Sequence, residues 1–286
     1  MQFWLIQTLN SVAFGGLLFL LASGFSLIFG LLRVPNLAHG ALFMLGAYGG
    51  ATLLGAGWSL APAALAVAAG VGLLGAAIER VLLRRLAGNE QGQVLVTLGI
   101  AFIIADLCLT TWGGDPMPLA APLAVSRPLR LAGYAFPTYR LVVLAVAAVA
   151  AVLLVLLMDH TRLGATIRAG VDDRQMAQGV GIRVGRLFNA VFFGGAALAG
   201  FGGVVGGPIL SAYPGLDTDM LPLALIVVIL GGVGSLGGAV VGSLLVGFIY
   251  NFGNALLPDF AYVVLFLPMV LALVFKPEGL FGRVAR

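Results

Sequence analysis

The sequence is poor in charged residues and in the residue types that build catalytic or metal sites. Only 9% of its 286 residues are charged, whereas soluble domains carry roughly a quarter. Lone Cys108 excludes an internal disulfide, and neither His39 nor His160 has a cysteine or carboxylate at metal-ligand spacing. We therefore expect no catalytic residues, no metal site and no cofactor bound by this chain. No Lys or Arg precedes Arg33, so a cleaved secretory signal is not expected.

The sequence also lacks an ATP-binding loop. No G-x-x-x-x-G-K-[ST] motif is present, so ATP chemistry must reside elsewhere. Gly232, Gly234 and Gly237 do spell G-x-G-x-x-G, but a dinucleotide site needs that turn within a βαβ unit. Apolar runs of membrane length flank it here. We expect no nucleotide site at this turn and no nucleic-acid partner.

Long apolar runs dominate what is present. The chain is 61% hydrophobic, and a helix needs about 20 apolar residues to cross a hydrocarbon core about 30 Å thick. We therefore predict an all-α, polytopic transmembrane helical bundle of about eight or nine membrane segments, forming a single domain over residues 1–286. The predicted segments cover residues 5–31, 37–55, 61–83, 94–112, 139–158, 187–209, 220–233, 236–252 and 260–275.

One polar island, residues 159–186, interrupts the apolar runs. Leu163, Ile167 and Val171 have helical spacing, and Asp172 is placed to cap a second short helix beginning near Asp173. Two short helices that project into water would suit insertion into a groove on another protein. The alternative is a solvated loop whose arginines only set the orientation of the chain.

The distribution of basic residues predicts that orientation. Basic residues favour the cytoplasmic side of short membrane loops. If residues 159–186 are cytoplasmic, alternation places twelve of the fifteen basic residues inside. The N-terminus is then predicted to lie outside and the C-terminus in the cytoplasm. The proline-rich loop 113–138 would be extracytoplasmic, either as a landing surface for a partner or as a passive connector.

Two Gly- or Pro-containing turns break the apolar sequence, one in each half of the chain, at residues 33–40 and 231–238. Unwound backbone at membrane depth persists only where it is buried or lines a cavity, so paired breaks indicate a transport path. His39 has two interpretations, a polar contact that holds its turn or a role in gating. The residues predicted to line the path are Asn36, His39, Gly40, Gly232, Gly234, Ser235 and Gly237.

Asp106 lies within a predicted span, where a charge is costly and suggests function by default. It could be the coupling site of an ion-driven carrier. It could instead reach the lipid headgroups or a neighbouring helix. This structural role is favoured, because proton-coupled carriers usually offer more than one such group, often with a basic partner.

Several segments together resemble the shorter of the two permease subunits of branched-chain amino acid ABC importers. The loop and the glycine-rich pair in one chain are more specific than either alone. The matching segments are GFSLIFGLLRVPNLAHGALFMLGAY (24–48), TRLGATIRAGVDDRQMAQGVGI (161–182), AALAGFGGVVGG (196–207), VVILGGVGSLGGAVVGSLLVG (227–247) and KPEGLFG (276–282).

The resemblance implies a passive, multi-pass pore subunit of a bacterial inner membrane. Its implied partners are a longer paralogous permease (a heterodimer), two cytoplasmic ATPase subunits that bind ATP and Mg, and an extracytoplasmic substrate-binding protein. Where the family often has a Glu-Ala-Ala-like triplet, this chain has Gln175-Met176-Ala177, which removes one negative charge from the docking helix. The residues that match the family's ATPase-coupling loop are Gly164, Arg168, Asp172, Asp173, Arg174, Ala177 and Gly181.

The resemblance favours branched-chain or other hydrophobic amino acids as the transported solutes. Importers of the same class for urea, short amides or other small solutes are an alternative, because the binding protein does most of the selecting. A stand-alone secondary transporter or channel is a second alternative, which leaves the polar island unexplained. A membrane-embedded enzyme is a third, and the sequence offers no convincing catalytic set for it.

Overall fold

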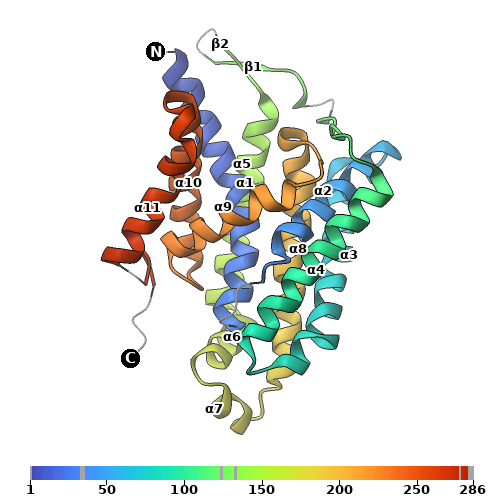
Figure 1. Cartoon of the computed structure of the whole chain (residues 1–286), viewed down its shortest axis with the longest axis vertical. Coiled ribbons are helices and arrows are strands. Elements are labelled where there is room, and N and C mark those ends of the chain that lie inside the picture. Colours follow the sequence, from blue (N-terminus) through green and yellow to red (C-terminus); the bar gives the residue numbers. More distant parts are fainter. Residues whose placement is uncertain (1, 33–35, 123–124, 132–133, 277, 283–286) are drawn as a thin grey trace.

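The computed structural model describes residues 2–32, 36–122, 125–131, 134–276 and 278–282. Most helices run along the long axis of the molecule, and one short β-hairpin lies at one end (Figure 1). The predicted helical bundle is thereby confirmed. The elements are α1 (Gln2–Leu32), α2 (His39–Gly55), α3 (Leu60–Val81), the 3-10 helix η1 (Leu83–Leu86), α4 (Glu90–Trp112), β1 (Leu129–Leu131), β2 (Tyr134–Phe136), α5 (Thr138–His160), α6 (Arg162–Asp172), α7 (Arg174–Gly179), α8 (Val184–Leu210), α9 (Leu216–Gly231), α10 (Leu236–Leu256), η3 (Pro258–Phe260) and α11 (Ala261–Phe275).

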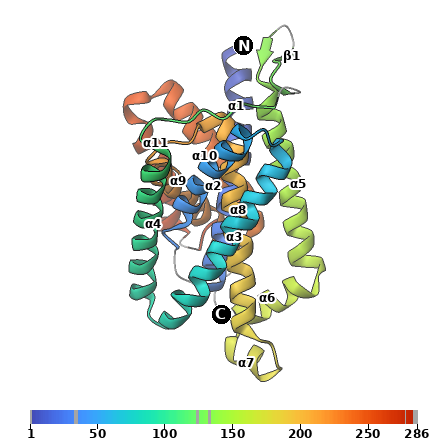
Figure 2. The same cartoon turned by 90° about the vertical axis from the view of Figure 1, so that its right-hand side faces the viewer.

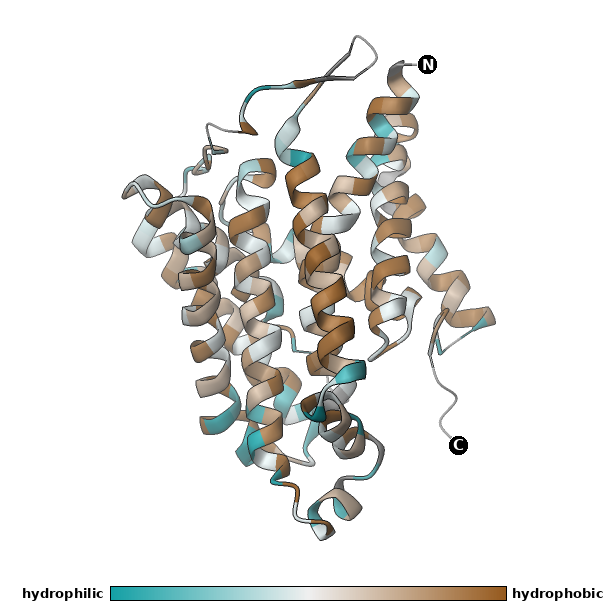
Figure 3. Ribbon diagram, turned by 180° about the vertical axis from the view of Figure 1, so that it is seen from behind, coloured by the Kyte–Doolittle hydropathy of each residue, from teal (hydrophilic) through white to brown (hydrophobic). Residues whose placement is uncertain are grey.

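Among the described residues, six helical segments are long and apolar enough to cross a membrane. They are α1, α3 with η1, α4, α5, α8 and α10. Helices α2, α9 and α11 have 17, 16 and 15 residues, so they are shorter than a full span. Hydrophobic residues cover the middle of the bundle, and hydrophilic ones gather toward its two ends (Figure 3). The predicted count of eight or nine segments is therefore not established, although the polytopic bundle is.

Helix α8 lies at the centre and packs against α1, α2 and α3. Small residues make the close crossings possible, because in lipid they let helix backbones approach. A Cβ on Gly203 of α8 would overlap the carbonyl oxygen of Phe43 and lie 2.7 Å from the backbone nitrogen of Ala47 in α2. A Cβ on Gly200 would lie 2.7 Å from the Cβ of Val71 in α3. The bundle therefore excludes larger side chains along the inner faces of α8.

The two ends of the bundle carry different connections. Residues 113–138 are predicted to be an ordered cap, and the described part of this loop is tied down. Met117 and Ala212 exchange two backbone hydrogen bonds of 2.7 and 3.0 Å, and Leu119 packs beside Gly207. The hairpin and the N-terminus lie at this end, whereas α6 and α7 lie at the opposite end (Figures 1 and 2).

Candidate functional site

The polar island folds as the predicted pair of short helices, α6 and α7, and each begins at a side-chain cap. The hydroxyl of Thr161 accepts a hydrogen bond from the Gly164 N–H at 3.2 Å. The Asp173 carboxylate accepts from the N–H groups of Gln175 and Met176, both at 2.9 Å. The prediction that Asp172 caps the second helix is wrong. Asp172 is the last residue of α6. Asp173 follows it with an extended backbone, which places its own carboxylate at the N-terminus of α7.

One face of α6 anchors the loop to the bundle. Ile167 is buried with Leu187 and Val191 of α8, and Leu27 of α1 packs against this cluster. Only part of the predicted apolar stripe is used, because Leu163 is exposed. Ile167 therefore fixes α6 beside both α1 and α8.

The turn from α5 into α6 requires a glycine. A Cβ on Gly164 would overlap the carbonyl oxygen of Met158. The Arg168 guanidinium donates a hydrogen bond to that same carbonyl and lies 3.5 Å from the Asp159 carboxylate. The ion pair is long and exposed, so the hydrogen bond to the carbonyl is the firmer contact. Arg168 therefore points back to α5 and holds the loop.

The tip of the loop carries exposed apolar side chains. Within α7 the side chain of Ala177 is buried, whereas the side chains of Met176 and Val180 are 66% and 70% exposed. Gly181 then turns the chain toward α8 with a φ of +88°, a conformation that glycine adopts without strain. Arg174 begins α7. The loop thus has a fixed base and exposed apolar side chains at its tip.

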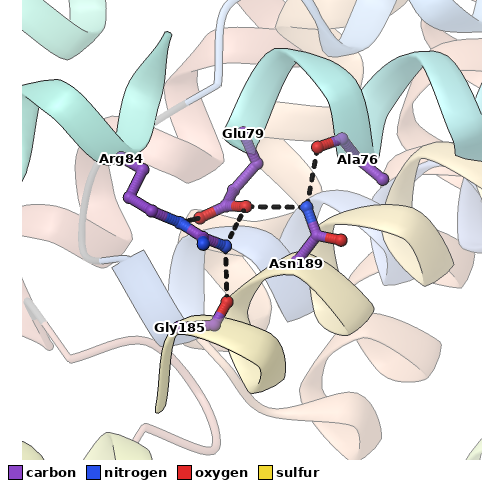
Figure 4. Close-up of polar contacts among 5 residues, drawn as sticks. All are labelled: Ala76, Glu79, Arg84, Gly185 and Asn189. Atoms are coloured by element: carbon purple, nitrogen blue, oxygen red, sulfur yellow. Dashed lines mark hydrogen bonds and ion pairs between the residues drawn. The ribbon is translucent and has the colours of Figure 1, made fainter. Parts of the chain in front are cut away.

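A buried polar network, which the sequence analysis missed, ties the base of the loop to α3 (Figure 4). Glu79 of α3 is 2% exposed, and its carboxylate accepts two hydrogen bonds from Arg84, at 3.2 and 2.9 Å. The amide of Asn189 donates to the same carboxylate at 2.7 Å and to the carbonyl of Ala76 at 2.7 Å. Arg84 also donates to the carbonyl of Gly185, at 2.6 Å. The start of α8, directly after the loop, is therefore bound to the end of α3.

Replacing Arg84 with alanine is expected to lower the melting temperature of the detergent-solubilised chain. It would leave the Glu79 charge buried with only Asn189 as partner, and breaking a buried pair costs about 3–5 kcal/mol. Because the Arg84 side chain is 41% exposed, screening reduces the expected cost to about 1–3 kcal/mol. Arg85→Ala removes an exposed neighbour that forms no ion pair among the described residues. Equal melting temperatures for the two variants would contradict the network.

The glycine-rich turn between α9 and α10 is held by the C-terminal segment. Gly232 and Gly234 have φ values of +100° and +75°. The N–H groups of Leu280 and Phe281 bond to the last carbonyls of α9, at 2.8 and 3.0 Å. Ser235 caps α10 by accepting from the Gly238 N–H at 3.0 Å, while Gly237 is exposed with no close neighbour. Residues 278–282, from the predicted segment KPEGLFG, thus close the end of α9.

The other predicted path residues are buried where α2 begins. His39 is fully buried, its Nε2 lies 3.0 Å from the carbonyl of Leu21 in α1, and its ring meets Phe25 edge-on. The side-chain amide oxygen Oδ1 of Asn36 accepts a hydrogen bond from the Ala38 N–H at 3.2 Å. A Cβ on Gly40 would lie 2.5 Å from the carbonyl of Asp217 in α9. The polar contact predicted for His39 is present, and its role in gating stays a prediction.

The C-terminal half of α1 connects the loop with both turns. Its Leu21 carbonyl meets His39, Leu27 packs on the cluster of α6 and α8, and a Cβ on Gly30 would lie 2.8 Å from the Cα of Gly234. The two predicted halves of the path are therefore joined through α1. Residues 33–35 of the first turn lie outside the described part of the chain.

Known proteins match nearly all of this chain. A family model described as the permease component of branched-chain amino acid transport systems matches residues 7–273. The chain belongs to this family. The permease is 27% identical to the high-affinity branched-chain amino acid transport system permease protein LivH of Escherichia coli K12, covering 98% of this chain and 96% of the relative.

Two other relatives give the same match. BraD of Pseudomonas aeruginosa, also a high-affinity branched-chain amino acid transport system permease protein, is 28% identical to the permease over 98% of this chain and 96% of its own length. A probable branched-chain amino acid transport permease protein LivH of Methanocaldococcus jannaschii is 26% identical over 96% and 91%. No solved structure matches the permease. The structural observations above therefore rest on this chain alone.

The permease offers no cluster of metal ligands in its described part, where no three His, Cys, Asp or Glu side chains gather. Asp106 of α4 is exposed on the outside of the bundle, apart from the two turns. The α6–α7 loop, the network around Glu79 and the C-terminal half of α1 form one connected unit at one end of the molecule.

Proposed function

We propose that this chain is the membrane-spanning permease subunit of an ABC importer that moves branched-chain and other hydrophobic amino acids across the inner membrane. The observation that carries the proposal is the α6–α7 loop. Its base is fixed to α1, α5 and α8, while the Met176 and Val180 side chains at its tip are 66% and 70% exposed. Exposed apolar residues on a polar projection mark a protein interaction site.

The proposed partner at this tip is one of two cytoplasmic ATPase subunits, which bind ATP and Mg. The cytoplasm is then on the side of α6 and α7, and the N-terminus and the hairpin lie outside. A longer paralogous permease would complete the pore as a heterodimer, and a binding protein would deliver the solute to the outer face. The names of the relatives and the positive charge near α6 and α7 support this arrangement.

The geometry supports a mechanical role for the loop. A push on α7 reaches α8 through Ile167 and Leu187, and it reaches α3 through the Arg84 bridge to Gly185. Movement of α1 would then displace both turns, because Gly30 abuts Gly234 and Leu21 holds His39. We propose that Asn36, His39, Gly40, Gly232, Gly234, Ser235 and Gly237 lie along the path that opens and closes.

Asp173→Ala is expected to reduce ATP-driven uptake several-fold while the protein level stays normal. The substitution removes the cap of α7, and loss of such a cap costs about 1 kcal/mol of helix stability. The short helix would fray where it meets the ATPase. Uptake of labelled leucine into membrane vesicles measures the effect. Asp159→Ala is the matched control, because its 3.5 Å ion pair is exposed and weak. Equal uptake by the two variants would remove α7 from the coupling step.

The solute can be tested by competition. Uptake of labelled leucine should be inhibited by isoleucine and valine, and it should be insensitive to urea and short amides at the same concentration. Inhibition by urea or amides alone would move the importer to that alternative solute class. Uptake that persists without any ATPase, and is lost in Asp106→Asn, would instead indicate a stand-alone carrier. The exposed position of Asp106 gives that alternative little support.

A further inference from the structure

A positively charged cavity lies at the same end of the bundle as the α6–α7 loop. It has a volume of about 280 Å³ and is lined by Arg80, Arg84, Arg186 and Asn189. The residues come from the end of α3, from η1 and from the start of α8. This cavity is not required by the coupling role, which uses Arg84 only through its bonds to Glu79 and Gly185.

The charges of the cavity are not balanced within the chain. Glu79 is the acid beside it, and both oxygens of that carboxylate are already engaged by Arg84 and Asn189 (Figure 4). The side chains of Arg80 and Arg186 form no ion pair or hydrogen bond with the described residues, and the Nη1 of Arg84 donates no hydrogen bond to them. The cavity therefore has three guanidinium groups beside a single carboxylate, and of these three only that of Arg84 contacts it. The cavity has spare donors for an anion and no free carboxylate for a cation.

An apolar surface continues from the cavity toward the middle of the bundle. On α3, Leu73 lies two turns before Arg80, on the same face, and is 64% exposed. On α8, Phe193 lies one turn after Asn189 and is also exposed. Phe193 also lies against α3, because a Cβ on Gly72, the residue before Leu73, would lie 2.9 Å from its ring. Both exposed side chains therefore belong to the apolar surface that α3 and α8 present beside the cavity. A cationic pocket at one end of an exposed apolar seam matches the shape and polarity of a phospholipid.

We propose that this cavity binds the phosphate headgroup of an anionic phospholipid, whose acyl chains lie along the seam of Leu73 and Phe193. Arginine forms paired hydrogen bonds with phosphate oxygens, and basic pockets between transmembrane helices on the cytoplasmic side suit anionic headgroups. A zwitterionic headgroup with an ammonium is a poorer match, because the Glu79 oxygens are occupied. A bound lipid would brace α3 against α8 directly beneath the coupling loop. The assignment of the cavity to the cytoplasmic side rests on the proposed orientation of the chain. The binding of an anionic lipid does not depend on that orientation.

Native mass spectrometry of the delipidated, full-length chain in detergent tests the proposal. Phosphatidylglycerol is expected to bind saturably and about tenfold more tightly than phosphatidylcholine. R80Q/R186Q should abolish that preference, since each basic side chain near an anionic lipid contributes about fivefold in binding. Neither side chain forms a hydrogen bond or ion pair with the described residues, so the variant should fold, and R80K/R186K should retain the preference. The matched control is R162Q/R183Q, which removes two exposed charges of the loop outside the cavity.

Three outcomes would overturn the proposal. The first is an equal affinity of the unmodified chain for the two lipids. The second is an equal loss of preference in R80Q/R186Q and R162Q/R183Q, which would indicate a general effect of charge. The third is binding of inorganic phosphate at millimolar concentration with displacement of phosphatidylglycerol, which would assign the cavity to a free anion. None of these outcomes depends on ATPase docking or on uptake, so the proposed function stands or falls separately.

Discussion

Gly203→Leu is expected to abolish accumulation of folded permease in the membrane. The new side chain would begin at a Cβ that already overlaps the Phe43 carbonyl and lies 2.7 Å from the Ala47 nitrogen. Helices α2 and α8 would have to separate by the width of a side chain, and α1 and α3 pack on the same α8. Such overpacking in a rigid core typically costs about 1–3 kcal/mol and occasionally more, and backbone against backbone leaves no rotamer to relieve it. Size-exclusion chromatography of a fluorescent fusion should show aggregate in place of a single peak.

Gly194→Leu is the matched control for this experiment. Gly194 lies in the same helix, and a Cβ there would meet nothing within 4 Å. This variant should elute as the unmodified protein does. A single sharp peak for Gly203→Leu, equal in height to that of Gly194→Leu, would contradict the close crossing of α2 and α8.

The double variant M176D/V180D should insert and fold normally but lose the ATPase. Both side chains are exposed at the loop tip, so their replacement leaves the core unchanged. Two carboxylates in an apolar contact must be desolvated without partners, which costs several kcal/mol and corresponds to at least a tenfold loss of binding. Recovery of ATPase with the tagged permease, normalised to permease, measures the effect.

Leu129→Asp provides the comparison for the docking variant. Leu129 is exposed on β1, at the opposite end of the molecule, and its replacement introduces the same chemistry away from the loop. This variant should recover as much ATPase as the unmodified chain. Full ATPase recovery with M176D/V180D would show that the α6–α7 tip is not the docking surface.

The long helices could be predicted from sequence because their limits are set by hydrophobic length. The predicted span 61–83 became α3 (Leu60–Val81), and the predicted span 187–209 became α8 (Val184–Leu210). The start of helix α9 was harder to predict. The helix begins at Leu216 and includes Asp217 and Asp219, and the charges of these two residues place the predicted start at residue 220. Charge excludes a residue from lipid but not from a helix buried within the bundle.

Contacts between distant segments could not be predicted from local pattern. Glu79 reaches Asn189 across 110 positions, and nothing in the sequence near either residue indicates the other. A signal was nevertheless available, because Glu79 is an acid inside the predicted span 61–83, close to a basic cluster. The sequence pattern indicated Asp106 as the acid within a span. The structure instead buries Glu79 and exposes Asp106.

The α6–α7 loop also combines features that local sequence determines with features that packing determines. Spacing and capping residues predicted its two helices, although the cap of the second helix is Asp173 and not Asp172. The inward direction of Arg168 and the exposure of Leu163 depend on how α6 lies against α1 and α8. The amphipathic pattern alone was compatible with either side of α6 facing the bundle. Packing on Ile167 therefore decided which face the loop presents to a partner.

Affinity purification of the tagged chain from its native membranes, in mild detergent, is the most direct measurement of the proposed role. We expect a stoichiometric ATPase and a second permease in the eluate, together with ATP hydrolysis that the M176D/V180D preparation lacks. A chain that elutes alone, without ATP hydrolysis, and still mediates amino acid uptake in liposomes would contradict the importer and identify a self-sufficient carrier.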